Sequence, residues 1–242
     1  MPRRPSADRA RPPGPERTLP HGAALLALAV LGVLVWITAT HLAGPAGPVY
    51  GVSRPMLAAA RADLAALPVR GSAPGDGYDR DEFGPAWDDV DGNGCDTRND
   101  VLARDLTATT VDAEDACTVL SGTLVDPYGG ATIAFERGPH SALVQIDHVV
   151  ALNDAWRTGA QDLSADARRR LANDPANLLA VDGPLNQDKG AEDSATWLPP
   201  NRGFRCAYVL RQVEVKAAYG LWVTPEEHDA MAHELDGCRV VG

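Results

Sequence analysis

The sequence predicts an α+β fold that follows an apolar N-terminal segment and carries two disulfides. Three observations support this prediction. Short runs with strand composition alternate with helical segments in the second half of the chain. The 242 residues, 45% of them hydrophobic, suffice for one domain with its own core. Four cysteines, an even number, all lie beyond the apolar segment.

The first 43 residues indicate export. Residues 1–22 are rich in arginine and proline, which predicts a disordered basic tail. Residues 23–39 carry no charge, and extension to residue 43 gives enough length for a hydrocarbon core of roughly 30 Å. The basic flank places the N-terminal end in the cytoplasm and the remainder outside. Segment 23–43 is therefore either an uncleaved transmembrane signal anchor or a signal peptide, and the protein is membrane-anchored or secreted.

The four cysteines are interpreted in the light of this export. Cys95, Cys117, Cys206 and Cys238 show no Cys-x-x-Cys spacing of the kind that zinc sites favour. In an oxidising compartment they predict two disulfides, for which three connectivities are possible. We favour Cys95–Cys117 and Cys206–Cys238, because each pair closes a local loop. Four free buried thiols would suit a cytosolic protein better.

The elements of the fold follow from composition and periodicity. Residues 44–54 form a Gly/Pro-rich linker, and the domain is expected over 55–242. A helix is predicted over 56–67, ended by Pro68, and residues 79–105 are polar and turn-rich. The predicted strands are 118–124, 132–135, 142–150 and 177–181. Further helices are predicted over 152–158, 164–172, 207–218 and 225–235, and one more opens near Leu185.

The most informative motif is the pair Asp147-His148, which ends an apolar strand-like run. It brings a ligand for hard cations and an imidazole base to one place. Asn177 opens the next strand, and Asn186 lies in the helix that follows. Hydrolysis of a phosphodiester needs a base for the attacking water and a positive charge for the phosphoryl and leaving oxygens. A histidine and a divalent ion supply these two needs.

These segments resemble the HNH, or ββα-metal, nucleases. The resemblance is carried by Asp-His-Val-Val-Ala-Leu at 147–152, Asn-Asp-Pro at 173–175, Asn-Gln at 186–187 and Trp-Leu-Pro-Pro at 197–200. The combination is similar to exported HNH-family proteins related to the C-terminal HNH domain of GmrSD-type restriction endonucleases. The similarity covers roughly residues 78–238, with the core motif at about 142–200.

The resemblance implies a ββα-metal core with additional helices and a role for each motif residue. His148 would be the general base, Asp147 and Asn186 the metal ligands, and Asn177 an orienting residue. The position of Lys189, one turn after Asn186, leaves two interpretations open: it reaches a phosphate oxygen, or it is a solvated lysine on the helix surface. Oxygen ligands suit Mg²⁺ or Mn²⁺. The implied activity is a metal-dependent endonuclease that cuts DNA, or alternatively RNA, with little sequence specificity.

A second motif suggests a structural calcium site. Asp89, Asp91 and Asn93 occupy positions one, three and five of a calcium-loop pattern. Gly94 stands at position six and Asp100 at position twelve, where glutamate would be the better bidentate ligand. The alternative interpretation is a tight Asp/Gly turn.

The charge balance argues against a nucleic-acid partner. The formal net charge is −11, and residues 44–242 carry 17 Lys+Arg against 31 Asp+Glu, which gives −14. Surfaces that bind DNA normally carry positive charge. A basic face around His148 is expected from Arg168, Arg169, Arg170, Lys189, Arg202, Arg205, Arg211 and Lys216. The acidity keeps a second reading open, a non-catalytic envelope binding module that retains the HNH scaffold and is stabilised by Ca²⁺. No protein partner can be inferred.

Overall fold

The computed structural model describes residues 50–241, which belong to one compact unit, Gly47–Gly242. The expected tail at 1–22 and apolar segment at 23–43 lie outside the described residues. Within 50–241, none of the helices combines the length and the apolar character needed to cross a membrane. Val52 is 2% exposed and packs in the core, so the folded unit already includes the end of the segment expected to be a linker.

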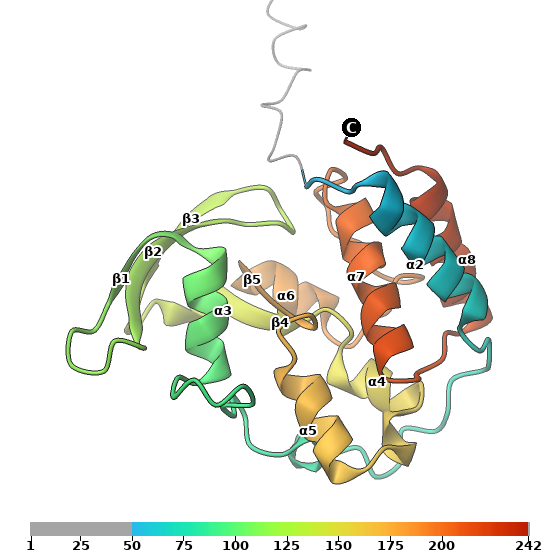
Figure 1. The fold of residues 1–242 in the computed structure, drawn as a ribbon, viewed down its shortest axis with the longest axis horizontal. Coiled ribbons are helices and arrows are strands. Elements are labelled where there is room, and N and C mark those ends of the chain that lie inside the picture. The colour runs from blue at the N-terminus through green and yellow to red at the C-terminus, as the bar shows by residue number, and fades with distance from the viewer. Residues whose placement is uncertain (1–49, 242) are drawn as a thin grey trace, which may run out of the picture. The chain divides into compact units, whose positions relative to one another are not determined.

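Three helices pack together at one end of the unit (Figure 1). They are α2 (Arg54–Ala66), α7 (Arg205–Ala218) and α8 (Pro225–Asp236). The Ser53 hydroxyl caps α2, and a capping box between Thr224 and Glu227 starts α8. Their apolar faces form the largest buried cluster, which confirms the helices predicted in these regions.

A three-stranded antiparallel sheet lies at the other end (Figure 1). Its order is β1 (Thr107–Val111), β2 (Val119–Val125) and β3 (Thr132–Glu136). The helix α3 (Thr97–Asp105) precedes it, capped by the Asp96 carboxylate. Strands β2 and β3 match the prediction, whereas α3 falls in a region expected to be turn-rich and β1 was not predicted.

A two-stranded antiparallel sheet lies between these parts (Figure 1). Its strands are β4 (Val144–His148) and β5 (Leu178–Asp182), and α6 (Gly183–Lys189) follows β5 directly. The connection from β4 to β5 contains α4 (Leu152–Arg157) and α5 (Ala165–Asn173). Short 3₁₀ turns complete the described elements: η1 (Arg80–Phe83), η2 (Ser141–Leu143) and η3 (Ala160–Asp162). The predicted α+β class is confirmed.

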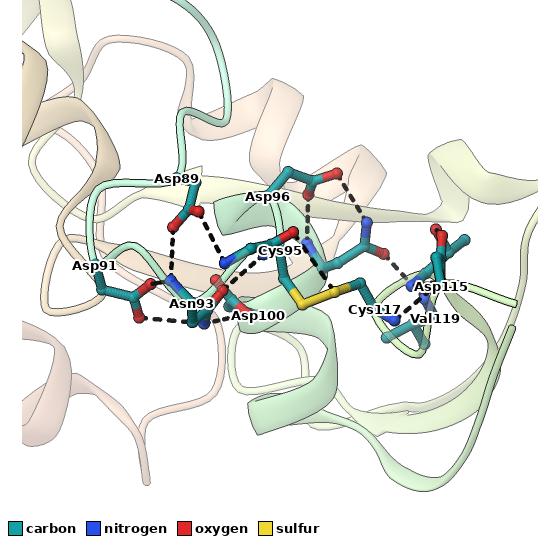
Figure 2. Close-up of a disulfide and its surroundings, with 12 residues drawn as sticks. Asp89, Asp91, Asn93, Cys95, Asp96, Asp100, Asp115, Cys117 and Val119 are labelled. Atoms are coloured by element: carbon teal, nitrogen blue, oxygen red, sulfur yellow. Dashed lines mark hydrogen bonds between the residues drawn. A yellow bond between two sulfur atoms is a disulfide. The ribbon is translucent and has the colours of Figure 1, made fainter. Parts of the chain in front are cut away.

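Both favoured disulfides are confirmed. Cys95 is bonded to Cys117, and Cys206 is bonded to Cys238. The first ties the loop before α3 to the loop between β1 and β2 (Figure 2). The second ties the start of α7 to the end of α8. Each bridge is worth about 2–4 kcal/mol through its restriction of the unfolded chain, and both fit an oxidising compartment outside the cytoplasm.

Candidate active site

The pair Asp147-His148 ends β4, beside the start of β5 and near α6. His148 is paired with Leu178, and β4 and α6 are in contact. Both side chains are largely buried, at 5% and 7% exposure, and both line a cavity of about 390 Å³. The cavity also takes lining from Gln145, Asn186 and the turn before η1. The sequence therefore brings three of the predicted site residues, Asp147, His148 and Asn186, to one cleft.

Each oxygen of the Asp147 carboxylate already has a donor. The Tyr128 hydroxyl donates to Oδ2, and the Lys189 ammonium donates to Oδ1 at 3.0 Å. Burial raises the pKa of Asp147, while the charge of Lys189 and the two hydrogen bonds oppose that rise. The carboxylate is thus fixed in direction by groups from a turn and from α6.

Contrary to the expectation, the Lys189 side chain does not point toward solvent. Its side chain is fully buried, and its ammonium donates to Asp147 at 3.0 Å and to the His148 carbonyl at 2.8 Å. The expectation that it reaches a phosphate oxygen is corrected: it lies behind Asp147, as the ion-pair partner of that residue. Helical spacing placed Lys189 one turn after Asn186 but could not tell which face of α6 is buried.

His148 is held in one tautomer by a backbone carbonyl. Its Nε2 lies 2.8 Å from the Ala172 oxygen, which can only accept, so Nε2 carries the proton and Nδ1 keeps a free lone pair. Burial lowers the pKa of His148 to about 3, with smaller contributions from the charges of Arg80 and Lys189. The imidazole is therefore neutral near pH 7. The Trp87 ring lies nearly parallel to it, with centroids 6.4 Å apart.

Asn177 joins the chain after His148 to the start of β5. Its Oδ1 accepts from the Val150 amide at 2.8 Å, and its Nδ2 donates to the Val150 and Leu171 carbonyls at 3.3 and 3.2 Å. The residue is fully buried. All of its side-chain hydrogen bonds are to backbone atoms, so it ties the chain just after His148 to α5, and it does not itself line the cleft.

Asn186 presents its amide at the cleft. Its Nδ2 donates to Gln145 Oε1 at 2.9 Å, which orients the opposite side of the amide, Oδ1, as an acceptor. Arg80, on η1, lines this cleft and also a second, smaller cavity of about 70 Å³ beside the imidazole. Tyr128, Arg80 and the Ala172 carbonyl were missed by sequence reasoning. No sequence signal marks them, because their relation to the motif arises only from tertiary contacts.

The calcium-loop pattern folds as a set of backbone-capping turns (Figure 2). Asp89 accepts from the amides of Gly92, Asn93 and Gly94 at 2.8, 3.2 and 2.9 Å. Asn93 donates to Asp91 and to Asp100, both at 3.2 Å. Burial and the neighbouring carboxylates raise the pKa of Asp100. The tight Asp/Gly turn, which was the alternative interpretation, describes what is seen.

Five of the eight cations from which a basic face was expected make ion pairs: Arg168, Arg169, Lys189, Arg205 and Lys216. Lys189 and Lys216 are the two lysines of the chain, and both are fully buried in ion pairs. Arg168 pairs with Glu82, and Arg169 pairs with Asp88. These side chains hold the fold together, so the prediction of a basic surface from clustering in sequence is wrong for them.

Lys216 centres a second buried charged cluster. Its ammonium lies 3.0 Å from Asp154 and 2.7 Å from Glu227, and Asp193 lies nearby. Burial raises the pKa of Glu227 to about 7. The cluster joins α4, α7 and α8, and its acidic oxygens surround an ammonium, so we assign it a structural role.

A larger cavity lies away from the motif. It measures about 530 Å³ and is lined by residues of α2, α7 and β2, among them Arg104 and Arg211. None of the predicted site residues lines it. The smaller cleft at His148 is the stronger candidate, because titratable groups and amide oxygens meet there.

The fold and the cleft define a class of protein: an α+β unit with a buried Asp-His pair at a strand end, facing an asparagine on the following helix. A family model described as GmrSD restriction endonucleases, C-terminal domain, matches residues 96–234, and the chain belongs to this family. It is also 38% identical over 201 residues to an "Uncharacterized secreted protein" of Arthroderma benhamiae, across 82% of this chain and 94% of that protein. No solved structure matches the chain.

Proposed function

We propose that the protein is an exported, metal-dependent HNH endonuclease that hydrolyses phosphodiester bonds of DNA, with RNA as a possible second substrate, and that His148 is its general base. The observation that carries this proposal is the geometry of His148. Its protonated Nε2 is held by Ala172, which leaves Nδ1 as the basic atom of a residue lining the cleft. Membership of a restriction-endonuclease family supports the reaction class. The antiparallel β4–β5 pair followed by α6 is consistent with a ββα core.

His148 would take the proton of the attacking water at Nδ1. The base must be neutral before the step, and the lowered pKa of His148 keeps it so at pH 7. As the imidazolium forms, Nε2 stays bound to the Ala172 carbonyl, so its dipole stabilises the new positive charge. The negative charge of a bound phosphodiester would raise the basicity of the ring from its value in the free protein.

The donor chemistry of the cleft fits a divalent ion. Asp147 and Asn186 both line it and offer oxygens only, which suits Mg²⁺ or Mn²⁺ together with water ligands. Each Asp147 oxygen accepts one hydrogen bond and retains a second lone-pair direction. When bound, the ion would neutralise charge on the phosphoryl oxygens and stabilise the leaving 3′ oxygen.

Lys189 and Asn177 would act as positioning residues. Lys189 holds Asp147 through Oδ1 and holds the backbone of His148 through its carbonyl. Asn177 ties the chain just after the pair, at Val150, to α5, at Leu171. Neither side chain lines the cleft, so each would act through another residue.

One observation favours the alternative, a non-catalytic binding module. Both Asp147 oxygens have protein donors, and an ammonium already supplies a positive charge beside them. A scaffold that has lost its metal would retain such an arrangement. The two functions differ in their expected activity: the endonuclease cleaves DNA when a divalent metal is supplied, and the binding module does not.

The test is nicking of supercoiled plasmid by the full chain with intact disulfides, in Mg²⁺, Mn²⁺ or EDTA. Loss of the base in His148→Ala should lower the rate about 10²–10⁴-fold. His140→Ala is the matched control, because His140 is exposed and lies outside the cleft. Equal activity of His148→Ala and wild type would reject His148 as the base. If the folded wild type cuts plasmid with neither Mg²⁺ nor Mn²⁺, the nuclease proposal is rejected and the binding module remains.

Export is part of the proposal. Two disulfides and a relative described as secreted support an extracytoplasmic location. Whether residues 23–43 remain as a membrane anchor is a separate prediction, which the mass of the mature protein decides.

The calcium loop also stays a prediction, separate from catalysis. Asp91, Asn93 and Asp100 are joined by hydrogen bonds through the Asn93 amide. A bound ion would stabilise the protein by about 2.7 kcal/mol at a concentration a hundred times its Kd. Thermal unfolding in CaCl₂ and in EGTA measures this effect, and equal midpoints would leave the turn as the sole explanation.

A further inference from the structure

We propose that Arg80 binds the scissile phosphate of the nucleic acid and is the cation of this site that contacts substrate directly. The inference rests on the proposed nuclease function and deepens it. Arg80 lies outside the residues that the family model matches. The motif therefore gives no reason to select it, and the argument depends on its place in the structure.

The lining of the cleft singles out Arg80. Among the described residues, it is the one lysine or arginine whose atoms line the 390 Å³ cavity that contains Asp147, His148 and Asn186. It also lines the smaller cavity beside the imidazole, together with His148 and Leu152. Arg80 thus stands where the two cavities meet, against the proposed base.

The guanidinium is available to a ligand. Arg80 is exposed, and within residues 50–241 its side chain makes no hydrogen bond or ion pair. Arg168 and Arg169, by contrast, are held by Glu82 and Asp88. Lys189, which contacts Asp147 and His148 directly, is fully buried and bound to Asp147.

The backbone that carries Arg80 is well fixed. The Asp79 carboxylate caps η1 by accepting from the Asp81 amide at 3.0 Å. Phe83, which is 1% exposed, anchors the turn in a core cluster. Arg168 binds both the carbonyl and the carboxylate of Glu82 at 2.8 Å, which ties η1 to α5. A cation on such a fixed turn needs little reordering to meet a ligand.

The chemistry of the group fits a phosphodiester. A guanidinium presents parallel N–H donors that match two phosphoryl oxygens, and its charge is permanent. The described unit is strongly acidic, so an approaching phosphate needs a local positive charge at the cleft. Arg80 provides that charge in the cleft that His148 also lines.

The experiment compares the full chain with Arg80→Ala, Arg80→Lys and Arg54→Ala in metal-dependent plasmid nicking. Arg54 is the matched control, because it is exposed, lines neither cavity and makes no side-chain hydrogen bond or ion pair among the described residues. We expect Arg80→Ala to lower kcat/KM by about 10²-fold or more, as for other lost transition-state donors. Arg80→Lys should fall between wild type and Arg80→Ala, and Arg54→Ala should stay within about twofold of wild type.

Two further measurements distinguish a loss of folding from a loss of function in the Arg80→Ala variant. Thermal unfolding of Arg80→Ala should match wild type, because the side chain has no described partner to lose. Binding of a labelled oligonucleotide by His148→Ala, with and without Arg80→Ala, should show weaker binding and a shallower salt dependence when Arg80 is absent. An active wild type whose Arg80→Ala variant cuts equally well overturns this inference alone. An inactive wild type overturns the proposed function, and this inference with it.

Discussion

The ion pair between Lys189 and Asp147 supports the sharpest stability prediction. Its side chains are 0% and 6% exposed, and its atoms lie 3.0 Å apart. Lys189→Met keeps the length of the side chain but leaves a buried carboxylate without its cation. Loss of one partner of a buried pair costs about 3–5 kcal/mol, because the remaining charge is not solvated. For a unit of this size, each kcal/mol shifts Tm by about 2–4 °C, so a loss of roughly 6–20 °C is expected.

The stability deficit of Lys189→Met should depend on pH, and the pKa of Asp147 sets the direction of that dependence. Burial already raises the pKa of Asp147 and Lys189 opposes the rise, so removal of Lys189 raises that pKa further. A carboxyl whose pKa is higher in the folded state contributes stability that is complete below its unfolded pKa and is lost as the pH rises. The deficit of Lys189→Met relative to wild type should therefore be largest near pH 7 and shrink as the pH falls toward 4.

Urea unfolding at pH 7 and pH 4, followed by circular dichroism, measures the effect. The double variant Asp147→Asn, Lys189→Met removes both charges and should recover part of the loss at pH 7. A free energy of unfolding for Lys189→Met within about 1 kcal/mol of wild type at pH 7 would refute the reasoning, since an exposed ion pair contributes no more than that. A deficit that does not change with pH would show that lost packing, and not charge, is responsible.

Three further predictions test the scaffold. Replacement of Cys95 and Cys117 by alanine should lower the free energy of unfolding by about 3 kcal/mol, because the bridge closes a loop across a sequence separation of 22; equal urea midpoints would contradict this. Asn177→Ala should cost about 1–3 kcal/mol by leaving the Val150 amide unpaired, which hydrogen exchange at that amide would report as lost protection. Burial raises the pKa of Glu227 from 4.5 to about 7, so wild type should lose stability as the pH rises from about 4.5 to 7. Glu227→Gln should flatten that slope, and an unchanged slope would assign the effect to another group.

Periodicity and turn residues predicted most of the regular elements. Strands β2 and β3 flank the Asp-Pro-Tyr-Gly-Gly turn, and the helices that became α2, α7 and α8 show apolar residues on one face. Helix α3 escaped prediction because part of its buried face is polar. Thr97 and Asn99 are buried there, and Asn99 accepts from the amide of Val119, in β2. Strand β1 escaped because all five of its residues are exposed, so no alternation marks it.

The candidate site was predicted as a set of residues but not as a set of contacts. Local sequence placed Asp147 and His148 at a strand end and Asn186 on the next helix. It could not show that Tyr128, nineteen positions before Asp147, would donate to it. It also could not show that Lys189 would turn inward. Both facts depend on how the turn before β3 and the buried face of α6 meet β4, and such long-range packing leaves no trace in local periodicity.

The acidity of the chain is a weaker argument against a phosphate-cutting function than it first suggests. Many of its aspartates accept hydrogen bonds from backbone amides in turns and at helix starts: Asp79, Asp89, Asp91, Asp96, Asp112, Asp115, Asp126, Asp174, Asp182 and Asp193. Aspartate is favoured in such positions because its short carboxylate satisfies amides that the backbone leaves unpaired. The excess of negative charge therefore follows from the number of turns and helix caps in the fold. The potential that a substrate meets at the cleft depends on the few charges that line it, and among these Arg80 is exposed while Asp147 is held against Lys189.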